Sequence, residues 1–223
     1  MREEAVCDVV VGFEMAETTT FLSNRYWENG TRPEYQLAPE GVSQAQLAGQ
    51  LFQKVLEENN VPIENVCICY SPFSRTTHTA QVVASVLNVQ FEGAQCKVME
   101  NLRERSFGPS YELLSHDKYH DIWALDEKDP FTKPEGGESV NDVACRLAEA
   151  IATLESQFQG CTILVVSHGD TLQILQTILN AAKLNAGSSY NDLASRIQAV
   201  QTPPVLSQHR KFSLLTAELR AVV

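Results

Sequence analysis

His168 lies at a predicted junction between a strand and a helix. It follows an uninterrupted apolar run at residues 163–166, and residues 171–183 after it repeat apolar side chains at helical spacing. A run without polar alternation is typical of a strand buried on both faces of a parallel sheet. Open α/β sheets bind ligands at the carboxyl ends of their strands, and helix N-termini favour anions. His168 is therefore a candidate phosphate-site residue. The alternative is a histidine that only caps the helix or packs in the loop.

Arg75 and Glu104 are candidates for the same site. Arg75 begins a second helical segment directly after an apolar run at residues 66–70, and Glu104 follows a third candidate strand. Because parallel strands end at one edge of a sheet, we expect Arg75 and His168 to meet. Arginine presents a fork of donors to phosphate oxygens, histidine can donate to a transferring phosphoryl group, and a carboxylic acid can protonate a leaving group. Taken singly, Arg75 could be a surface helix residue and Glu104 a solvated charge, but together they predict phosphoryl chemistry.

The alternation of strands and helices predicts a three-layer α/β/α sandwich around one mixed sheet. The segment at residues 109–138, rich in aromatic and charged residues, is a candidate lid or substrate-shaping insertion. The expected strands are residues 66–70, 96–99, 162–167 and 213–219. A clear helix is expected from residues 38–42 to Asn59-Asn60, and further helices are expected at residues 76–87, 141–158 and 171–183.

Composition limits the partners of this chain. Its 223 residues carry a net charge of −11, so we expect neither nucleic acid nor an anionic membrane surface as a partner. A small phosphorylated metabolite would need a local basic pocket. The six cysteines fall mostly in apolar runs without paired CxxC blocks, and no secretory signal is apparent, which indicates reduced thiols and a cytoplasmic location. We expect no cofactor and no metal, and the sequence does not indicate an oligomeric state.

Five sequence blocks resemble the histidine phosphatase superfamily, or phosphoglycerate mutase-like family, and within it a plant-type branch. The resemblance runs from about Tyr35 to the C-terminus, which suggests a domain at residues 35–223 after a variable segment at residues 1–34 that keeps a remnant of the first strand. It implies that Arg75 clamps phosphate, Glu104 donates the proton and His168 stabilises the transferring phosphoryl group. The blocks are Leu37-Ala-Pro-Glu-Gly-Val-Ser-Gln-Ala, Ser71-Pro-Phe-Ser-Arg-Thr-Thr-His-Thr-Ala80, Leu102-Arg-Glu104, Gly136-Gly-Glu-Ser139 and Val166-Ser-His-Gly169.

The chain departs from that family at its nucleophile. Family members open with a strand ending in Arg-His-Gly, whose histidine is phosphorylated, but this sequence contains no Arg-His-Gly and its first histidine is His78. Tyr26-Trp27 resembles the opening of that strand and runs directly into Glu28-Asn-Gly30, which resembles the loop well past the motif. This has the form of an internal deletion, as in a splice variant. Covalent catalysis would lack its acceptor. Two classes stay open: a phosphatase or mutase that works by another route, and an inactive relative that binds phosphorylated ligands or nothing.

Loss of a central strand has a predicted structural consequence. Buried N–H and C=O groups left without partners cost about 1–3 kcal/mol each, so the chain must refill the position or be poorly stable. The segment ending at Tyr26-Trp27 is the favoured replacement, and Val9-Val-Val11 is the second candidate.

Three other patterns carry less weight. Cys69-x5-Arg75 has the spacing of cysteine-dependent phosphatases, but Pro72 lacks an N–H and the loop has no glycine to wrap a phosphate. His116 and His120 have i, i+4 spacing, yet solvated lid residues are preferred over a metal pair. Gln208-His-Arg-Lys211 is either a small basic patch near the pocket or the exposed start of the last strand.

Overall fold

Five short strands make one mixed sheet in the computed structural model, which describes residues 9–12, 30–111, 119–185 and 192–221. The strands are β1 (Val9–Gly12), β2 (Val66–Tyr70), β3 (Cys96–Val98), β4 (Thr162–Val166) and β5 (Leu219–Ala221). Their order is β3-β2-β4-β1-β5, and β5 alone among these strands runs antiparallel to its neighbour.

β2 and β4 lie side by side at the centre of the sheet. Every residue of both strands is buried, as expected for continuous apolar runs in a parallel sheet. Cys67 lies opposite Ile163 and Cys69 opposite Val165. The prediction that these two runs share one sheet is therefore confirmed.

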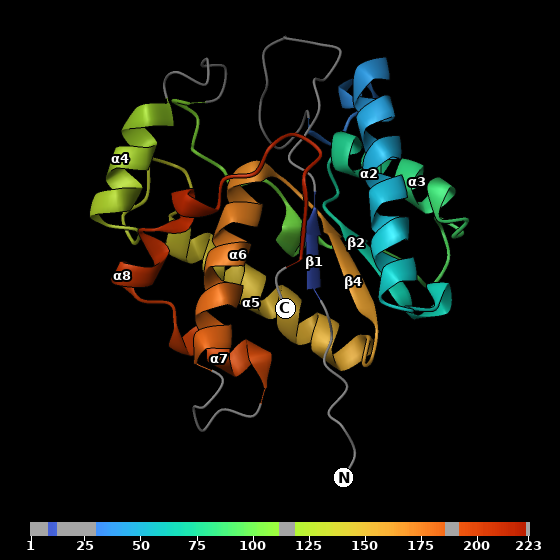
Figure 1. The fold of residues 1–223 in the computed structure, drawn as a ribbon. Coiled ribbons are helices and arrows are strands. Elements are labelled where there is room, and N and C mark those ends of the chain that lie inside the picture. The colour runs from blue at the N-terminus through green and yellow to red at the C-terminus, as the bar shows by residue number, and fades with distance from the viewer. Residues whose placement is uncertain (1–8, 13–29, 112–118, 186–191, 222–223) are drawn as a thin grey trace.

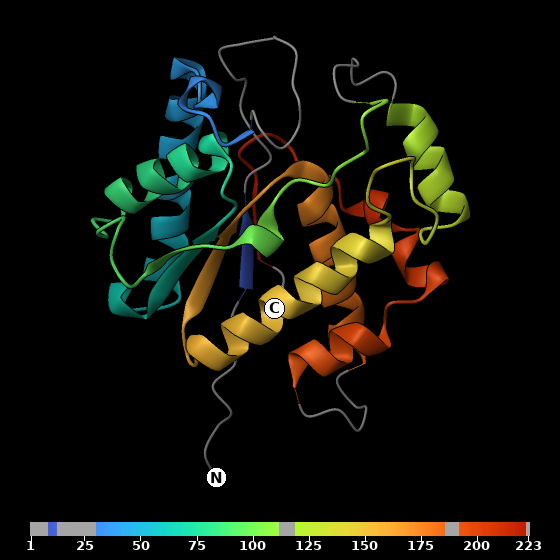
Figure 2. The ribbon, with the colours of Figure 1, turned by 180° about the vertical axis from the view of Figure 1, so that it is seen from behind.

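Helices cover both faces of the sheet, which confirms the predicted α/β/α layering. Figures 1 and 2 show α2 and α3 on one side and α5 and α6 on the other. None of the helices in the described ranges is both long and apolar enough to cross a membrane. The α-helices are α2 (Pro39–Glu58), α3 (Ser74–Val86), α4 (His120–Lys128), α5 (Val140–Gln157), α6 (Gly169–Leu184), α7 (Leu193–Ala199) and α8 (Pro203–Leu206), with 3-10 turns at Pro33–Tyr35, Ile63–Asn65, Glu100–Leu102 and His209–Phe212.

Alternating side chains of the central strands fill two separate cores. Cys69 and Val165 join the apolar cluster beneath α5 and α6. Ile68 and Leu164 join the cluster beneath α2 and α3. Burial of an isoleucine or leucine side chain stabilises the fold by about 1.5–3 kcal/mol, so the two cores hold the central strands firmly.

The position beside β4 is filled by β1. Val9 pairs with Ile163 and Gly12 with Val166 in parallel register, and the other edge of β1 pairs with β5. The favoured candidate for this position, the segment ending at Tyr26-Trp27, was therefore wrong, and the second candidate is confirmed. A run of three valines suits a strand that is paired on both sides. Tyr26 and Trp27 themselves lie outside the described residues.

The last strand begins later than predicted. Residues 213–219 were expected to form it, but β5 spans Leu219–Ala221. Two buried side chains explain the difference: His209 lies in a 3-10 turn with its side chain buried, and Leu214 packs in the core beneath α5 and α6. Leu214 therefore serves core packing rather than strand pairing, while its neighbour Leu215 is exposed.

The pairing of β1 predicts the effect of a proline in this strand. Val10→Pro removes a backbone donor from a strand paired on both sides and should lower the free energy of unfolding by about 1–3 kcal/mol in urea denaturation. Val10→Ile keeps the N–H and the β-branched side chain and serves as the control. Equal midpoints for Val10→Pro and Val10→Ile would contradict the assignment of this strand.

Candidate functional site

The polar site begins where β2 and β4 end. The ladder continues one step past β2, because the Ser71 N–H donates to the Val166 carbonyl at 3.0 Å. Thr76 Oγ1 then donates to the carbonyls of Ser71, at 3.0 Å, and Phe73, at 2.8 Å, and so ties the first turn of α3 to the end of β2. Arg75 lies in that first turn. His168 is the N-cap of α6, two residues past the end of β4.

Arg75, Glu104 and His168 meet at this edge of the sheet. Arg75 Nη2 lies 2.9 Å from His168 Nδ1 and 3.3 Å from Glu104 Oε2. On the other side of the ring, His168 Nε2 lies 2.7 Å from Ser71 Oγ. A guanidinium can only donate, so Nδ1 accepts and the ring proton resides on Nε2, which donates to Ser71. One tautomer of His168 is thereby selected.

His168 is neutral in this arrangement. Its side chain is 1% exposed, and burial, followed by the positive charges of Arg75 and Arg146, lowers the pKa of the imidazole well below its ordinary value. Glu104 Oε2 lies 3.4 Å from Nδ1, but with a neutral ring the two groups do not form an ion pair. Arg75 Nη2 contacts both and offsets the repulsion between their lone pairs.

Phe73 supports both partners of the central contact. Its buried ring meets the His168 ring edge to face, with centroids 5.0 Å apart. The guanidinium carbon of Arg75 lies 5.0 Å from the centroid of the same ring. An aromatic side chain therefore fixes the arginine by a cation–π contact and the histidine by packing.

The backbone around Glu104 is attached to the sheet and to α6. Ser167 Oγ donates to the Leu102 carbonyl at 2.6 Å, and Thr171 Oγ1 donates to the Arg103 carbonyl at 3.0 Å. The Arg105 N–H donates to Glu104 Oε1 at 3.2 Å. The carboxylate is thus held on one oxygen while the other faces Arg75.

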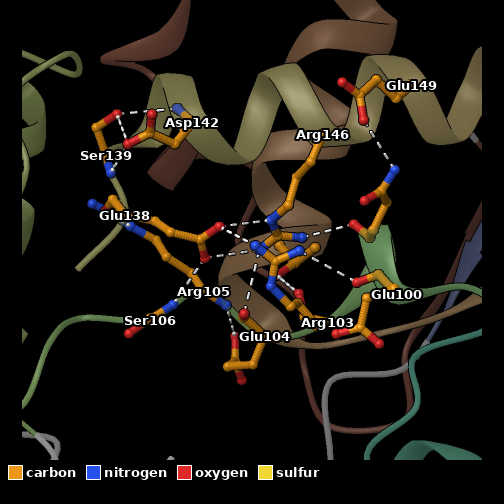
Figure 3. A network of polar contacts seen from close by, with 12 residues as sticks. Glu100, Arg103, Glu104, Arg105, Ser106, Glu138, Ser139, Asp142, Arg146 and Glu149 are labelled. Atoms are coloured by element: carbon orange, nitrogen blue, oxygen red, sulfur yellow. Dashed lines mark hydrogen bonds and ion pairs between the residues drawn. The ribbon is translucent and has the colours of Figure 1, made fainter. Parts of the chain in front are cut away.

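Glu138 joins two arginines behind the site. Its carboxylate accepts from Arg103 Nη2 at 2.7 Å, from Arg146 Nε at 3.0 Å and from the Ser106 N–H at 3.1 Å. Figure 3 shows Arg146 reaching from α5 toward the segment that carries Glu104. Arg146 also donates to the carbonyls of Asn101, at 2.7 Å, and Glu104, at 3.3 Å. The Glu138 carboxylate therefore orients Arg146, and Arg146 in turn holds the backbone of Glu104.

Two glycines allow Glu138 to approach this segment. Gly108 has φ +86° and Gly136 has φ +72°, backbone conformations that L side chains rarely adopt. A Cβ on Gly108 would lie 2.1 Å from the Glu135 carbonyl oxygen. The two turns touch closely enough for the Glu138 N–H to donate to the Ser106 carbonyl at 2.8 Å.

The structure brings together all three residues predicted from the sequence for this site. Arg75, Glu104 and His168 form one cluster of direct contacts. Their roles as phosphate-binding residue, proton donor and phosphoryl-stabilising residue stay predictions. Sequence reasoning missed Ser71, Arg146 and Glu138. Arg146 carried a signal, because it lies on the apolar face of its helix, next to Leu147, where a charged residue requires a buried partner.

The less favoured patterns lie elsewhere. Cys69 is fully buried in the core beneath α5 and α6, unlike the accessible thiolate that a cysteine phosphatase needs. His120 is exposed on α4, and His116 lies outside the described residues. No group of three or more His, Cys, Asp and Glu side chains suited to a metal ion occurs among the residues described. The short basic stretch does not begin a strand, because residues 209–212 form a 3-10 turn. His209 is buried, and the guanidinium carbon of Arg210 lies 3.9 Å from the centroid of the Trp123 ring.

Comparisons with known proteins identify the family and the fold of the chain. The model of the histidine phosphatase superfamily (branch 1) matches residues 16–198. Among solved structures, the chain is similar to mycobacterial hydrolase 1, with 19% identity, a TM-score of 0.59 and coverage of 96% of this chain and 87% of that one. It is similar to a mycobacterial glucosyl-3-phosphoglycerate phosphatase in complex with VO3, with 21% identity, a TM-score of 0.59 and coverage of 86% and 87%. It is also similar to YhfR of Bacillus stearothermophilus, with 24% identity, a TM-score of 0.55 and coverage of 78% and 80%. These similarities show a shared fold. Among curated proteins, none matches.

The position of Glu138 between two arginines predicts its contribution to stability. Glu138→Gln keeps the shape of the side chain but removes the charge that Arg103 and Arg146 share, and it should lower the free energy of unfolding by about 1–3 kcal/mol. Glu149→Gln is the matched control, because Glu149 is exposed and its carboxylate accepts one described hydrogen bond, from Asn101 at 3.3 Å. Its effect should stay within about 0.5 kcal/mol in the same denaturation experiment. Equal losses in the two variants would show that Glu138 has no special role.

Proposed function

Because the chain belongs to the histidine phosphatase superfamily (branch 1), we propose that Arg75, Glu104 and His168 bind the phosphoryl group of a small phosphate ester, and that covalent catalysis is impaired. The observation that carries the binding proposal is the 2.9 Å contact between Arg75 Nη2 and His168 Nδ1. The Arg75 guanidinium, which is always charged, and the His168 imidazole, which can titrate, thus face each other. A phosphate oxygen bound between them can replace their mutual hydrogen bond.

The charges around the site favour an anion. Burial lowers the pKa of His168, and so do Arg75 and Arg146, so both arginines contribute positive potential at the ring. The chain as a whole carries −11, so this local potential is what would attract a phosphorylated ligand. A bound dianion would offset the two arginines and allow His168 to take up a proton on Nδ1. The ring could then donate to the phosphate from Nδ1 and to Ser71 from Nε2.

Glu104 suits the role of proton donor to the leaving group. Its Oε2 lies beside both Arg75 and His168, and its Oε1 accepts from the backbone of the next residue. An ester oxygen bound next to Arg75 would lie within reach of this carboxyl group. Protonation of the leaving oxygen by a positioned acid is the usual contribution of such a residue.

The sequence after β1 supports the impairment. In the family that this chain resembles, the strand beside β4 ends in the phosphorylated histidine. Here β1 ends at Gly12 and continues into Phe13-Glu14, and no histidine precedes His78 in the whole sequence. The remaining residues offer oxygen clamps and a proton donor but no acceptor at the strand end for a phosphoryl group.

Binding of a dianion should depend on pH through His168. Sulfate is a suitable probe, because its charge stays constant across about pH 5–8 while an unperturbed histidine titrates there. In the ligand-free protein the pKa of His168 is low, and the bound dianion raises it, so binding takes up a proton. Calorimetry should therefore show sulfate affinity falling as pH rises, by up to about tenfold per pH unit, and levelling off above the pKa of the complex.

Two variants separate His168 from other causes of such a pH dependence. His168→Asn keeps a polar side chain but removes the titration, so its sulfate affinity should not vary with pH. The same change at the exposed His120 should retain the wild-type slope. A wild-type affinity independent of pH, or an unchanged slope in His168→Asn, would contradict the role given to the ring.

The proposed impairment is tested by looking for the covalent intermediate. After incubation with an aryl phosphate at neutral pH, mass spectrometry should find no acid-labile phosphohistidine, because β1 ends at Gly12 and the first histidine of the sequence is His78. Hydrolysis of the ester should not exceed that of a His168→Ala variant. Phosphohistidine on any peptide, or hydrolysis that His168→Ala abolishes, would restore the enzyme hypothesis.

A further inference from the structure

A buried ion cluster lies behind the site. Arg105 is fully buried and binds Asp126 of α4 with both terminal nitrogens, at 2.7 Å for Nη1 and 2.8 Å for Nη2. Arg105 Nη1 also donates to Asp170 Oδ2 at 3.1 Å. His209 completes the cluster, with Nε2 3.4 Å from Asp170 Oδ1 and 3.8 Å from Asp126 Oδ2. The cluster therefore joins side chains from four separate segments of the chain around one guanidinium.

The cluster is covalently adjacent to both ends of the site. Arg105 follows Glu104 directly, and its own N–H donates to the Glu104 carboxylate. Asp170 lies in the first turn of α6, two residues after His168. A shift of the Arg105 side chain would therefore be passed to Glu104 through one peptide unit and to His168 through two.

Further contacts of Arg105 reach the segment before α5 and a pair of aromatic rings. Its Nε donates to the Glu138 carbonyl at 2.9 Å, so the residue whose carboxylate holds Arg146 is also fixed by its backbone. The guanidinium carbon lies 5.1 Å from the Phe107 ring, which packs on Tyr119 with centroids 4.9 Å apart. The start of α4 is thus placed by the same arginine.

We infer that Arg105 is a positioning residue. By joining α4 and the start of α6 to the segment that carries Glu104, it keeps the Glu104 and His168 side chains aligned with Arg75. The purpose given to this alignment, binding of a phosphoryl group, rests on the proposed function. The geometry itself is independent of that function. A planar guanidinium bound at both terminal nitrogens fixes direction as well as distance, which a lysine ammonium does not.

The desolvation cost of this cluster supports a directional role. Replacement of a buried ion cluster by apolar side chains of similar volume is often neutral or stabilising, so ion pairs are weak evidence for stability alone. Here the bonds of Arg105 are spread over carboxylates of two helices and one carbonyl, each from a different segment. Apolar packing could fill the same volume but would not fix the orientation of the three segments.

Three variants test the inference. Arg105→Lys keeps the positive charge but loses the pair of terminal nitrogens that binds Asp126. Asp126→Asn weakens the bond between Arg105 and α4 without changing a residue of the site. Leu154→Ala is the control. Leu154 is buried near the C-terminal end of α5, and its truncation destabilises the core without removing any of the polar contacts of Arg105, Glu104 or His168 described above. Urea denaturation identifies variants that remain folded. If Arg105→Lys does not fold, Asp126→Asn alone decides.

The readout is the titration of His168 followed by ¹⁵N NMR of the imidazole. In the wild-type protein the ring is buried between Ser71, Phe73, Arg75 and Arg146 and faces Glu104, and it should titrate well below an ordinary histidine, with the proton on Nε2. If the contacts of Arg105 loosen, water should reach the His168 ring, and the ring should move away from Arg75 and Arg146. We expect its pKa to rise by about half a unit or more in Arg105→Lys and Asp126→Asn, and to stay unchanged in Leu154→Ala.

Sulfate affinity in the same samples distinguishes the two proposals. If the wild-type protein binds no sulfate, the proposed function fails, while the titration of His168 still decides the role of Arg105. If Arg105→Lys and Asp126→Asn titrate like the wild-type protein, or if Leu154→Ala shifts His168 as much as they do, Arg105 is only a structural residue and the inference is overturned.

Discussion

The register between β2 and β4 determines where every polar group of the site lies. Tyr70 is paired with Val166, so the chains leave the sheet at the same level, and the Ser71 N–H adds one more bond to the Val166 carbonyl. A slip by one residue would turn the apolar side chains of each strand toward the opposite core. Because both cores are filled by alternate residues of these strands, the register is fixed by packing. Ser71 and His168 meet at 2.7 Å as a result.

Charge balance is the second constraint, since arginines concentrate at one edge of an acidic chain. Arg75, Arg103, Arg105 and Arg146 all have carboxylate partners, namely Glu104, Glu138, Asp126 and Asp170. Burial raises the pKa of the Asp170 carboxyl, but Arg105 and His209 hold it well below its usual range, so the carboxylate stays charged. The arginines behind the site are thereby oriented and partly neutralised. Arg75 is the one whose terminal nitrogen contacts the His168 ring.

Sequence reasoning succeeded where a local pattern determines the structure. The unbroken apolar runs of β2 and β4 predicted central parallel strands, and the carboxyl ends of those strands predicted that Arg75 and His168 would meet. It failed where partners from distant segments compete. Two upstream segments could form the missing strand, and the choice of Val9–Gly12 depends on pairing with β4 and β5. Likewise, the identity of the partners of Arg105 could not be read from its neighbours, because Asp126 and Asp170 are distant in the sequence.

β1 pairs with β4 through its backbone, and its last residue, Gly12, has no side chain. Residues 9–12 thus complete the sheet between β4 and β5. Cellular proteolysis removes chains that populate unfolded states, and it does not distinguish active from inactive folded proteins. Pairing of both edges of β1 therefore lowers the population of unfolded chains and protects the protein from such proteolysis, whatever its activity.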